Sequence, residues 1–367
     1  MTDQHTSPAL GALVDLGLPG IGGLDGVPTA EEPQSAKDFT SDQEVRWCPG
    51  CGDYAVLAAV RSFLPTLGIK RENTVFVSGI GCSSRFPYYL NTYGMHSIHG
   101  RAPTIATGLA ITRPDLSVWV VTGDGDALSI GGNHLIHALR RNVNLKILLF
   151  NNRIYGLTKG QYSPTSEQGK VTKSTPLGSI DHPFNPVSMA LGAEATFVGR
   201  AIDSDRKNLT AVLGAAAAHR GTALVEILQD CPIFNDGSFD VLRKDGKENR
   251  IVPLTHGEPI RFGSEGADGL GTHAVVADGL RLKVVDAASV DPSDIVVHDA
   301  GSHELAFALS RLSDQDLTHT VTGIFRDSSR ATYDDAARAQ VAQAKAADSA
   351  PSLQSLLNGR DTWTVAG

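Results

Sequence analysis

The stretch SVWVVTGDGD at positions 117–126 decides the fold. Four of its first six residues are Val or Trp, which is typical of a strand buried on both faces. A helix is expected over 133–141, and a second apolar strand over 145–150 runs into Asn151 and Asn152. A buried strand, a helix and another buried strand predict a parallel βαβ unit.

The same alternation extends in both directions, from about 45 to 235. The further expected elements are a helix over 53–64, a strand over 74–78, a helix over 103–111, a strand over 196–199, a helix over 205–219 and a strand over 223–228. This pattern predicts the α/β class, with a parallel sheet covered by helices on both faces.

The sequence pattern predicts three segments in the chain. Residues 1–44 are expected to form an arm, either unstructured or in contact with a partner, because their glycines interrupt any periodicity. Residues 45–240 form the α/β domain. The pattern is weaker over 241–367, which we expect to be a C-terminal extension that packs on the core or on a partner subunit.

Composition excludes several classes of protein. The 367 residues include 32 Lys and Arg against 40 Asp and Glu, a formal net charge of -8, which argues against non-specific nucleic-acid binding. No apolar run approaches the roughly 20 residues of a membrane-spanning helix. The first residues lack the basic and apolar regions of a secretory signal, so we expect a cytoplasmic protein. Thiols stay reduced there, and four cysteines indicate metal ligands or catalysts rather than disulfides.

Polar residues follow both strands of the βαβ unit. Asp124 and Asp126 lie after the first strand, and Asn152 lies after the second. The carboxyl ends of parallel strands meet at one edge of the sheet, where ligands bind. Carboxylate and amide oxygens suit Mg²⁺, which usually joins them to substrate phosphates. The alternative is a pair of ordinary turns, since Asp, Asn and Gly are turn residues.

The four cysteines lie in turns or at strand ends, where distant segments can converge. Cys48 and Cys51 form a C-x-x-C loop, while Cys82 and Cys231 are single. Four thiolates can hold an iron–sulfur cluster or a tetrahedral zinc ion. The spacing favours iron–sulfur, because structural zinc sites usually use two short-spaced pairs. Cys82 or Cys231 taken alone is also compatible with an ordinary buried cysteine.

The cysteines and the polar residues that follow the strands alternate along the chain with three further motifs. These are IGCSS at 80–84, HGR at 99–101 and YGLTKGQ at 155–161. Together they resemble the beta subunit of 2-oxoacid:ferredoxin oxidoreductases, most closely those that act on 2-oxoglutarate. The resemblance covers about residues 45–240. It implies a thiamine diphosphate-binding fold of the diphosphate-binding type, because the paired G-D-G and N-N motifs are those of thiamine diphosphate enzymes.

The resemblance also implies cofactors and their ligands. Cys48, Cys51, Cys82 and Cys231 would ligate one 4Fe–4S cluster. Asp124, Asn152 and the backbone carbonyl of Ile154 would bind Mg²⁺. The residues implied to bind thiamine diphosphate are Ile80, Ser83, His99, Gly123, Asp124, Gly125, Asp126, Asn152, Gly156, Leu157 and Thr158. Lys159 and Arg85 are candidates for holding substrate carboxylates, since both are cationic.

The implied reaction is oxidative decarboxylation of 2-oxoglutarate with coenzyme A to succinyl-CoA and CO₂, with electrons passing through the cluster to ferredoxin. Thiamine enzymes use a Glu from a second domain, and this chain has only one predicted α/β unit. The resemblance places that Glu on an alpha subunit, so we expect an α2β2-type heterotetramer and an inactive isolated chain. The alternatives are a pyruvate or other 2-oxoacid enzyme and, more distantly, a zinc-stabilised non-catalytic binding protein.

Overall fold

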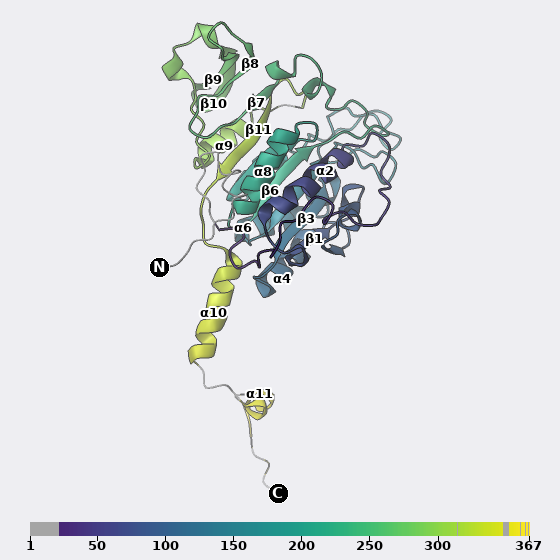
Figure 1. Cartoon of the computed structure of the whole chain (residues 1–367), viewed down its shortest axis with the longest axis vertical. Coiled ribbons are helices and arrows are strands. Elements are labelled where there is room, and N and C mark those ends of the chain that lie inside the picture. Colours follow the sequence, from purple (N-terminus) through teal and green to yellow (C-terminus); the bar gives the residue numbers. More distant parts are fainter. Residues whose placement is uncertain (1–21, 314, 348–351, 360, 364, 366) are drawn as a thin grey trace.

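A mostly parallel eight-stranded sheet forms the centre of the molecule (Figure 1). The computed structural model describes residues 22–313, 315–347, 352–359, 361–363, 365 and 367. The strand order is β2-β1-β3-β4-β6-β5-β11-β7. The strands are β1 (Thr74–Ser78), β2 (Tyr93–His96), β3 (Ser117–Gly123), β4 (Lys146–Asn151), β5 (Phe197–Ile202), β6 (Ala223–Leu228), β7 (Ile251–Pro253) and β11 (Thr320–Asp327).

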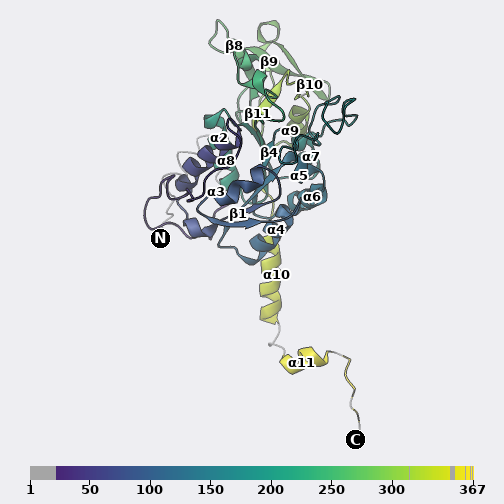
Figure 2. The same cartoon turned by 90° about the vertical axis from the view of Figure 1, so that its right-hand side faces the viewer.

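The central strands are mostly apolar because helices cover both faces of the sheet (Figure 2). Side chains alternate between two cores: in β3, Val118 and Val120 join one cluster, whereas Trp119 and Val121 join the other. The first cluster includes residues of α4 (Ala102–Thr112), α6 (Gly132–Arg141), α7 (Pro186–Gly192) and α9 (His303–Ser310). The second includes residues of α2 (Asp53–Phe63) and α8 (Arg206–Ala218). The predicted fold class is confirmed.

The C-terminal segment contributes to the main sheet. Strand β11 pairs antiparallel with β5, and β7 pairs parallel with β11. The same segment forms a separate antiparallel sheet of β8 (Arg261–Glu265), β9 (Gly271–Asp278) and β10 (Arg281–Asp286). It continues in α10 (Tyr333–Ala347) and α11 (Leu353–Asn358). Two strands that lie after residue 240, β7 and β11, are therefore part of the main sheet.

Residues 22–44 pack on the α/β domain rather than forming a free arm. Phe39 is fully buried in the core cluster that includes the residues of α2. Isolated bridges join Thr29 to Ile69 and Thr40 to Leu90. The sequence pattern missed this packing because a few anchoring side chains hold an otherwise irregular segment. Residues 1–21 of the expected arm lie outside the described residues.

Within the described ranges, no helix combines the length and the apolar character needed to cross a membrane.

Candidate active site

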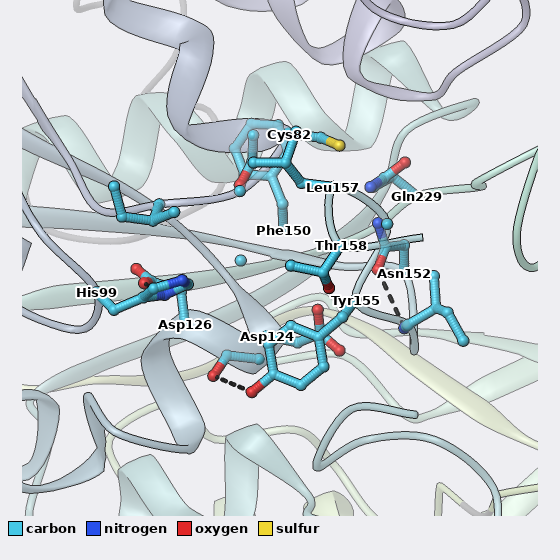
Figure 3. A pocket seen from close by; sticks show the side chains of 17 residues that line it. Cys82, His99, Asp124, Asp126, Phe150, Asn152, Tyr155, Leu157, Thr158 and Gln229 are labelled. Carbon is cyan, nitrogen blue, oxygen red and sulfur yellow. Dashed lines mark hydrogen bonds and ion pairs between the residues drawn. The ribbon is translucent and has the colours of Figure 1, made fainter. Parts of the chain in front are cut away.

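A cleft with a cavity volume of about 50 Å³ opens where β3 and β4 end (Figure 3). The structure brings all eleven residues predicted for thiamine diphosphate to its lining. These are Ile80, Ser83, His99, Gly123, Asp124, Gly125, Asp126, Asn152, Gly156, Leu157 and Thr158. Ile154, predicted to offer a carbonyl to Mg²⁺, also lines it, as do Cys82, Phe150, Tyr155 and Gln229.

Asp124 is the buried acid of this cleft. It begins the short helix α5 (Asp124–Leu128), and its Oδ2 accepts hydrogen bonds from Ser163 Oγ at 2.5 Å and Thr165 Oγ1 at 2.6 Å. Burial raises the pKa of this carboxyl to about 6, against the lowering effect of the two hydroxyls. A buried carboxylate needs a compensating charge, which a divalent cation supplies.

Asn152 lies opposite, directly after β4. Its Oδ1 accepts a hydrogen bond from the backbone N–H of Ile154 at 3.2 Å, which turns the chain at the strand end. The carboxylate of Asp124, the amide of Asn152 and the segment at Ile154 thus surround one cleft. These oxygen donors are of the kind that Mg²⁺ prefers.

Asp126 fixes His99 at the side of the cleft. Asp126 Oδ1 lies 2.8 Å from His99 Nδ1 and accepts the N–H of Gly100 at 2.9 Å, while Oδ2 accepts from Thr122 Oγ1 at 2.8 Å. With its oxygens satisfied by the protein, Asp126 holds the proton of His99 on Nδ1. His99 is thereby oriented with its other ring nitrogen available to a ligand.

Two features of the lining fit a large polar ligand. Gly81 has a φ of +120°, and a Cβ atom there would meet nothing within 4 Å, so the backbone leaves open space. Gln229 is 1 % exposed, and its Oε1 has no hydrogen-bond partner within the described part of the chain. A buried amide oxygen without a hydrogen-bond donor lowers the stability of the fold, and a bound ligand or its water would supply the donor.

The four cysteines are all free thiols, and they are near enough to one another for their charges to interact. A Cβ atom at Gly156 would lie 3.5 Å from Cys82 Sγ and 3.7 Å from Cys231 Sγ, so two thiols flank the cofactor loop. The C-x-x-C loop of Cys48 and Cys51 ends where α2 begins. Trp47 Nε1 donates to the carbonyl of Cys82 at 2.7 Å and ties this loop to the turn after β1.

The thiols influence one another electrostatically. Burial raises the pKa of Cys82 to about 12, and the charges of Asp53, Cys231 and Cys48 add to the increase. Burial likewise raises the pKa of Cys51 and of Cys231. Four thiolates in so confined a region require positive charge to be stable, which the irons of a cluster provide. Cysteine thiolates are the ligands that iron–sulfur clusters use, so the chemistry of these four residues agrees with a cluster.

Among the residues that the structure describes, no group of three or more His, Cys, Asp or Glu side chains is arranged to hold a metal ion. The predicted Mg²⁺ set is of a different kind, since it combines one carboxylate with an amide oxygen and a carbonyl.

Neither residue predicted to hold substrate carboxylates is among the described residues that line the cleft. Lys159 is exposed in the loop after Thr158, with a φ of +76°. Arg85 donates from Nε to Tyr89 Oη at 3.0 Å, and its charge lowers the pKa of Cys82. Both lie on loops that adjoin the cleft, and their role stays a prediction.

Sequence reasoning missed Ser163, Thr165 and Gln229. The two hydroxyl residues lie in a polar loop far along the chain from Asp124, and nothing in their spacing predicts the contact. Gln229 carried a weak signal, because it follows the last central strand and lies two residues before Cys231.

Comparison with known proteins confirms the resemblance. Residues 79–227 match the family model for the C-terminal TPP binding domain of thiamine pyrophosphate enzymes. The chain is 71% identical over 358 residues to the 2-oxoglutarate oxidoreductase subunit KorB of Mycobacterium tuberculosis, across 96% of this chain and 94% of that protein. It is 45% identical over 210 residues to the 2-oxoacid:ferredoxin oxidoreductase subunit beta of Sulfolobus sp, across 57% of this chain and 68% of that one.

A solved structure supports the same family. The 2-oxoglutarate:ferredoxin oxidoreductase from Magnetococcus marinus, with 2-oxoglutarate, coenzyme A and succinyl-CoA bound, matches with a TM-score of 0.73 and 32% identity, over 92% of this chain and 100% of that chain. On this evidence the chain belongs to the family of 2-oxoacid:ferredoxin oxidoreductase beta subunits.

Proposed function

We propose that this chain is the beta subunit of a 2-oxoglutarate:ferredoxin oxidoreductase. The enzyme would convert 2-oxoglutarate and coenzyme A to succinyl-CoA and CO₂, and pass the two electrons released to ferredoxin. The name of the relative from Mycobacterium tuberculosis and the ligands of the Magnetococcus marinus enzyme support 2-oxoglutarate as the substrate.

One structural observation carries this proposal. The loop of Gly156 lines the cleft and also passes against the thiols of Cys82 and Cys231. A cofactor in the cleft and a cluster on these thiols would therefore be separated by little more than one segment of backbone. Short separation is what electron transfer from the reaction site to a carrier needs.

Each implied cofactor has a proposed set of ligands in this chain. Asp124, Asn152 and the carbonyl of Ile154 would hold Mg²⁺, and Cys48, Cys51, Cys82 and Cys231 would hold one 4Fe–4S cluster. When bound, thiamine diphosphate supplies an electron sink for decarboxylation, and the cluster supplies a one-electron carrier.

The chain's own residues bind and orient these groups. Asp126 keeps His99 directed at the cleft, and Tyr155 donates from its hydroxyl to the Gly125 carbonyl at 2.9 Å, which joins the two loops of the cleft. Phe150 is 1 % exposed and lines the cleft floor, where it excludes water. Lys159 and Arg85 remain the proposed partners of substrate carboxylates.

The proposal includes an alpha subunit, because thiamine enzymes need a Glu from a second domain. The working unit would be an α2β2-type heterotetramer in the cytoplasm, and ferredoxin would be its electron acceptor.

The test is to produce the chain with its alpha subunit under anaerobic conditions and follow ferredoxin reduction. We expect kcat/KM for 2-oxoglutarate to exceed that for pyruvate, and the isolated chain to be inactive. A preference for pyruvate or another 2-oxoacid would overturn the substrate assignment. Turnover by the isolated chain would overturn the need for an alpha subunit.

A further inference from the structure

Two buried hydroxyls act on the carboxylate that is proposed to bind magnesium. Ser163 and Thr165 are 2 % and 4 % exposed, and Asp124 is 3 % exposed. Both hydroxyls donate to the same carboxylate oxygen, Oδ2, at 2.5 and 2.6 Å. Hydrogen bonds of this length to an ionised oxygen are strong, and burial protects them from competition by water.

The two carboxylate oxygens of Asp124 therefore have different partners. The oxygen that accepts both hydroxyls is committed to the protein, and its partner Oδ1 accepts from no side chain in the hydrogen bonds found within the described residues. Without the hydroxyls, the carboxylate could rotate about its Cβ–Cγ bond and present either oxygen or both. With them, one orientation is selected before any cation arrives.

Thr165 has a second contact that links both sides of the proposed metal site. Its Oγ1 lies 2.9 Å from Oδ1 of Asn151, the residue before Asn152. Asn151 is itself held, since its Nδ2 donates to Glu226 Oε1 at 2.7 Å and its Oδ1 accepts the backbone N–H of Arg153 at 3.1 Å. The single hydroxyl proton of Thr165 is shared between two acceptors, Asp124 Oδ2 and Asn151 Oδ1, so this oxygen lies between the end of β3 and the end of β4.

This contact is anchored in the sheet. Glu226 accepts Arg200 Nε at 2.7 Å, and Arg200 Nη1 donates to Ser313 Oγ at 2.9 Å. Arg200 and Glu226 lie opposite each other on β5 and β6 and are 4 % and 1 % exposed. The loop hydroxyl at Thr165 is thus connected to rigid strands, which is the kind of support that fixes a ligand-binding side chain.

We propose that Ser163 and Thr165 are positioning residues, whose hydroxyls fix Asp124 so that one carboxylate oxygen is offered to a divalent cation. Outer partners of metal ligands typically contribute 10- to 100-fold to metal affinity, about the size of effect expected here.

The test uses Thr165→Val, which keeps the shape of the side chain and removes its hydroxyl, in the complex with the alpha subunit. Thiamine diphosphate binding is measured by equilibrium dialysis over a series of Mg²⁺ concentrations. We expect the half-saturating Mg²⁺ concentration to rise about 10- to 100-fold, and binding to recover at high Mg²⁺. Thr165→Ser retains the hydroxyl and should stay within about threefold of the unmodified complex.

Two controls separate positioning from folding. Thr112→Val makes the same chemical change at the exposed end of α4, where the hydroxyl bonds only within its own helix, and should leave the Mg²⁺ dependence unchanged. Ser163→Ala removes the second hydroxyl and provides an independent variant if Thr165→Val does not fold. It should also raise the Mg²⁺ requirement.

The positioning role rests on the proposed function, and the outcomes distinguish the two. Mg²⁺-dependent binding that is the same in Thr165→Val, Ser163→Ala and the unmodified complex would overturn the positioning role alone. An unmodified complex that binds no thiamine diphosphate at any Mg²⁺ concentration would overturn the proposed function itself.

Discussion

Gly156 lies directly against Cys82: a Cβ atom added to Gly156 would be 3.5 Å from the Cys82 Sγ atom. The two residues come from different parts of the sheet, Cys82 from the turn after β1 and Gly156 from the loop after β4. Both line the same cleft. The proposed thiamine and cluster sites are therefore neighbours that share residues, rather than separate modules joined by a linker.

The two sites should nevertheless be separable by mutation. Cys82→Ala removes one proposed cluster ligand and should lower the iron content while thiamine diphosphate still binds. Asp124→Asn keeps the size of the side chain but removes the charge that Mg²⁺ requires, so it should lose thiamine diphosphate and keep iron. Iron and thiamine are measured per polypeptide in each variant. If either variant retained its own cofactor in full, that residue assignment would fail.

Gly125 should tolerate no side chain. A Cβ atom at Gly125 would come within 2.2 Å of the Tyr155 ring, so Gly125→Ala must displace Tyr155 and break its hydrogen bond to the Gly125 carbonyl. We expect thiamine diphosphate affinity to fall at least about tenfold, as for other disrupted supporting contacts.

A matched control exists in the same chain. Gly108 lies within α4, and a Cβ atom there would meet nothing within 4 Å. Gly108→Ala should leave thiamine binding intact and raise stability by about 0.5–1 kcal/mol, because alanine favours the helix. Equal thiamine affinity in the two alanine variants would contradict the close packing of Gly125 against Tyr155.

Magnesium binding should weaken as the pH falls through about 6, because the buried carboxyl of Asp124 has its pKa raised to about that value. Below it, a proton competes with the cation, and the apparent affinity should fall about tenfold per pH unit. Calorimetric titration with Mg²⁺ alone measures this without a contribution from the phosphates of the cofactor. The same affinity at about pH 5 and about pH 7 would contradict the assignment of Asp124 as a ligand.

The same shift has the opposite effect on the metal-free chain. Because the folded-state pKa lies above the ordinary value of 3.8, the folded state binds this proton more tightly than the unfolded state does. The contribution of Asp124 to stability is therefore most favourable below the ordinary value and is lost as the pH rises through about 6. Mg²⁺ should reverse this loss at neutral pH, which denaturant unfolding with and without the cation would detect.

Breaking the buried ion pair of Arg200 and Glu226 should be costly, because it leaves one buried charge without its partner. Its Nε–Oε2 distance is 2.7 Å and both side chains are buried. Arg200→Met leaves a buried carboxylate without its cation and should destabilise the fold by about 3–5 kcal/mol. Lys70→Met breaks the exposed pair with Glu31 and should change stability by less than about 1 kcal/mol. Urea unfolding compares the two, and similar losses would contradict the buried role of Arg200.

Much of the fold was predictable because the central strands are buried on both faces. The structure places β1 and β6 at the predicted residues, 74–78 and 223–228. Strand β2 gave no such signal, because all four of its residues are exposed at the edge of the sheet. Strand β11 joins β5 from far along the chain, and that pairing is decided by tertiary packing rather than by local pattern.

In the candidate site, too, local sequence predicts some residues and tertiary packing decides others. Residues that follow strands, such as Asp124 and Asn152, were predictable because the geometry of a parallel sheet gathers them at one edge. Thr165 was not, because loop hydroxyls have many possible partners and only the folded chain selects Asp124. The packing of residues 22–44 was not foreseen, because isolated buried side chains such as Val27 and Phe39 anchor an otherwise irregular segment.

The proposed function depends most on one chain holding a 4Fe–4S cluster beside its thiamine site. The most direct measurement is iron, acid-labile sulfide and zinc per polypeptide in chain purified without oxygen. We expect about four irons with matching sulfide and little zinc. One zinc with no sulfide would remove the path for electrons and contradict the ferredoxin-linked function.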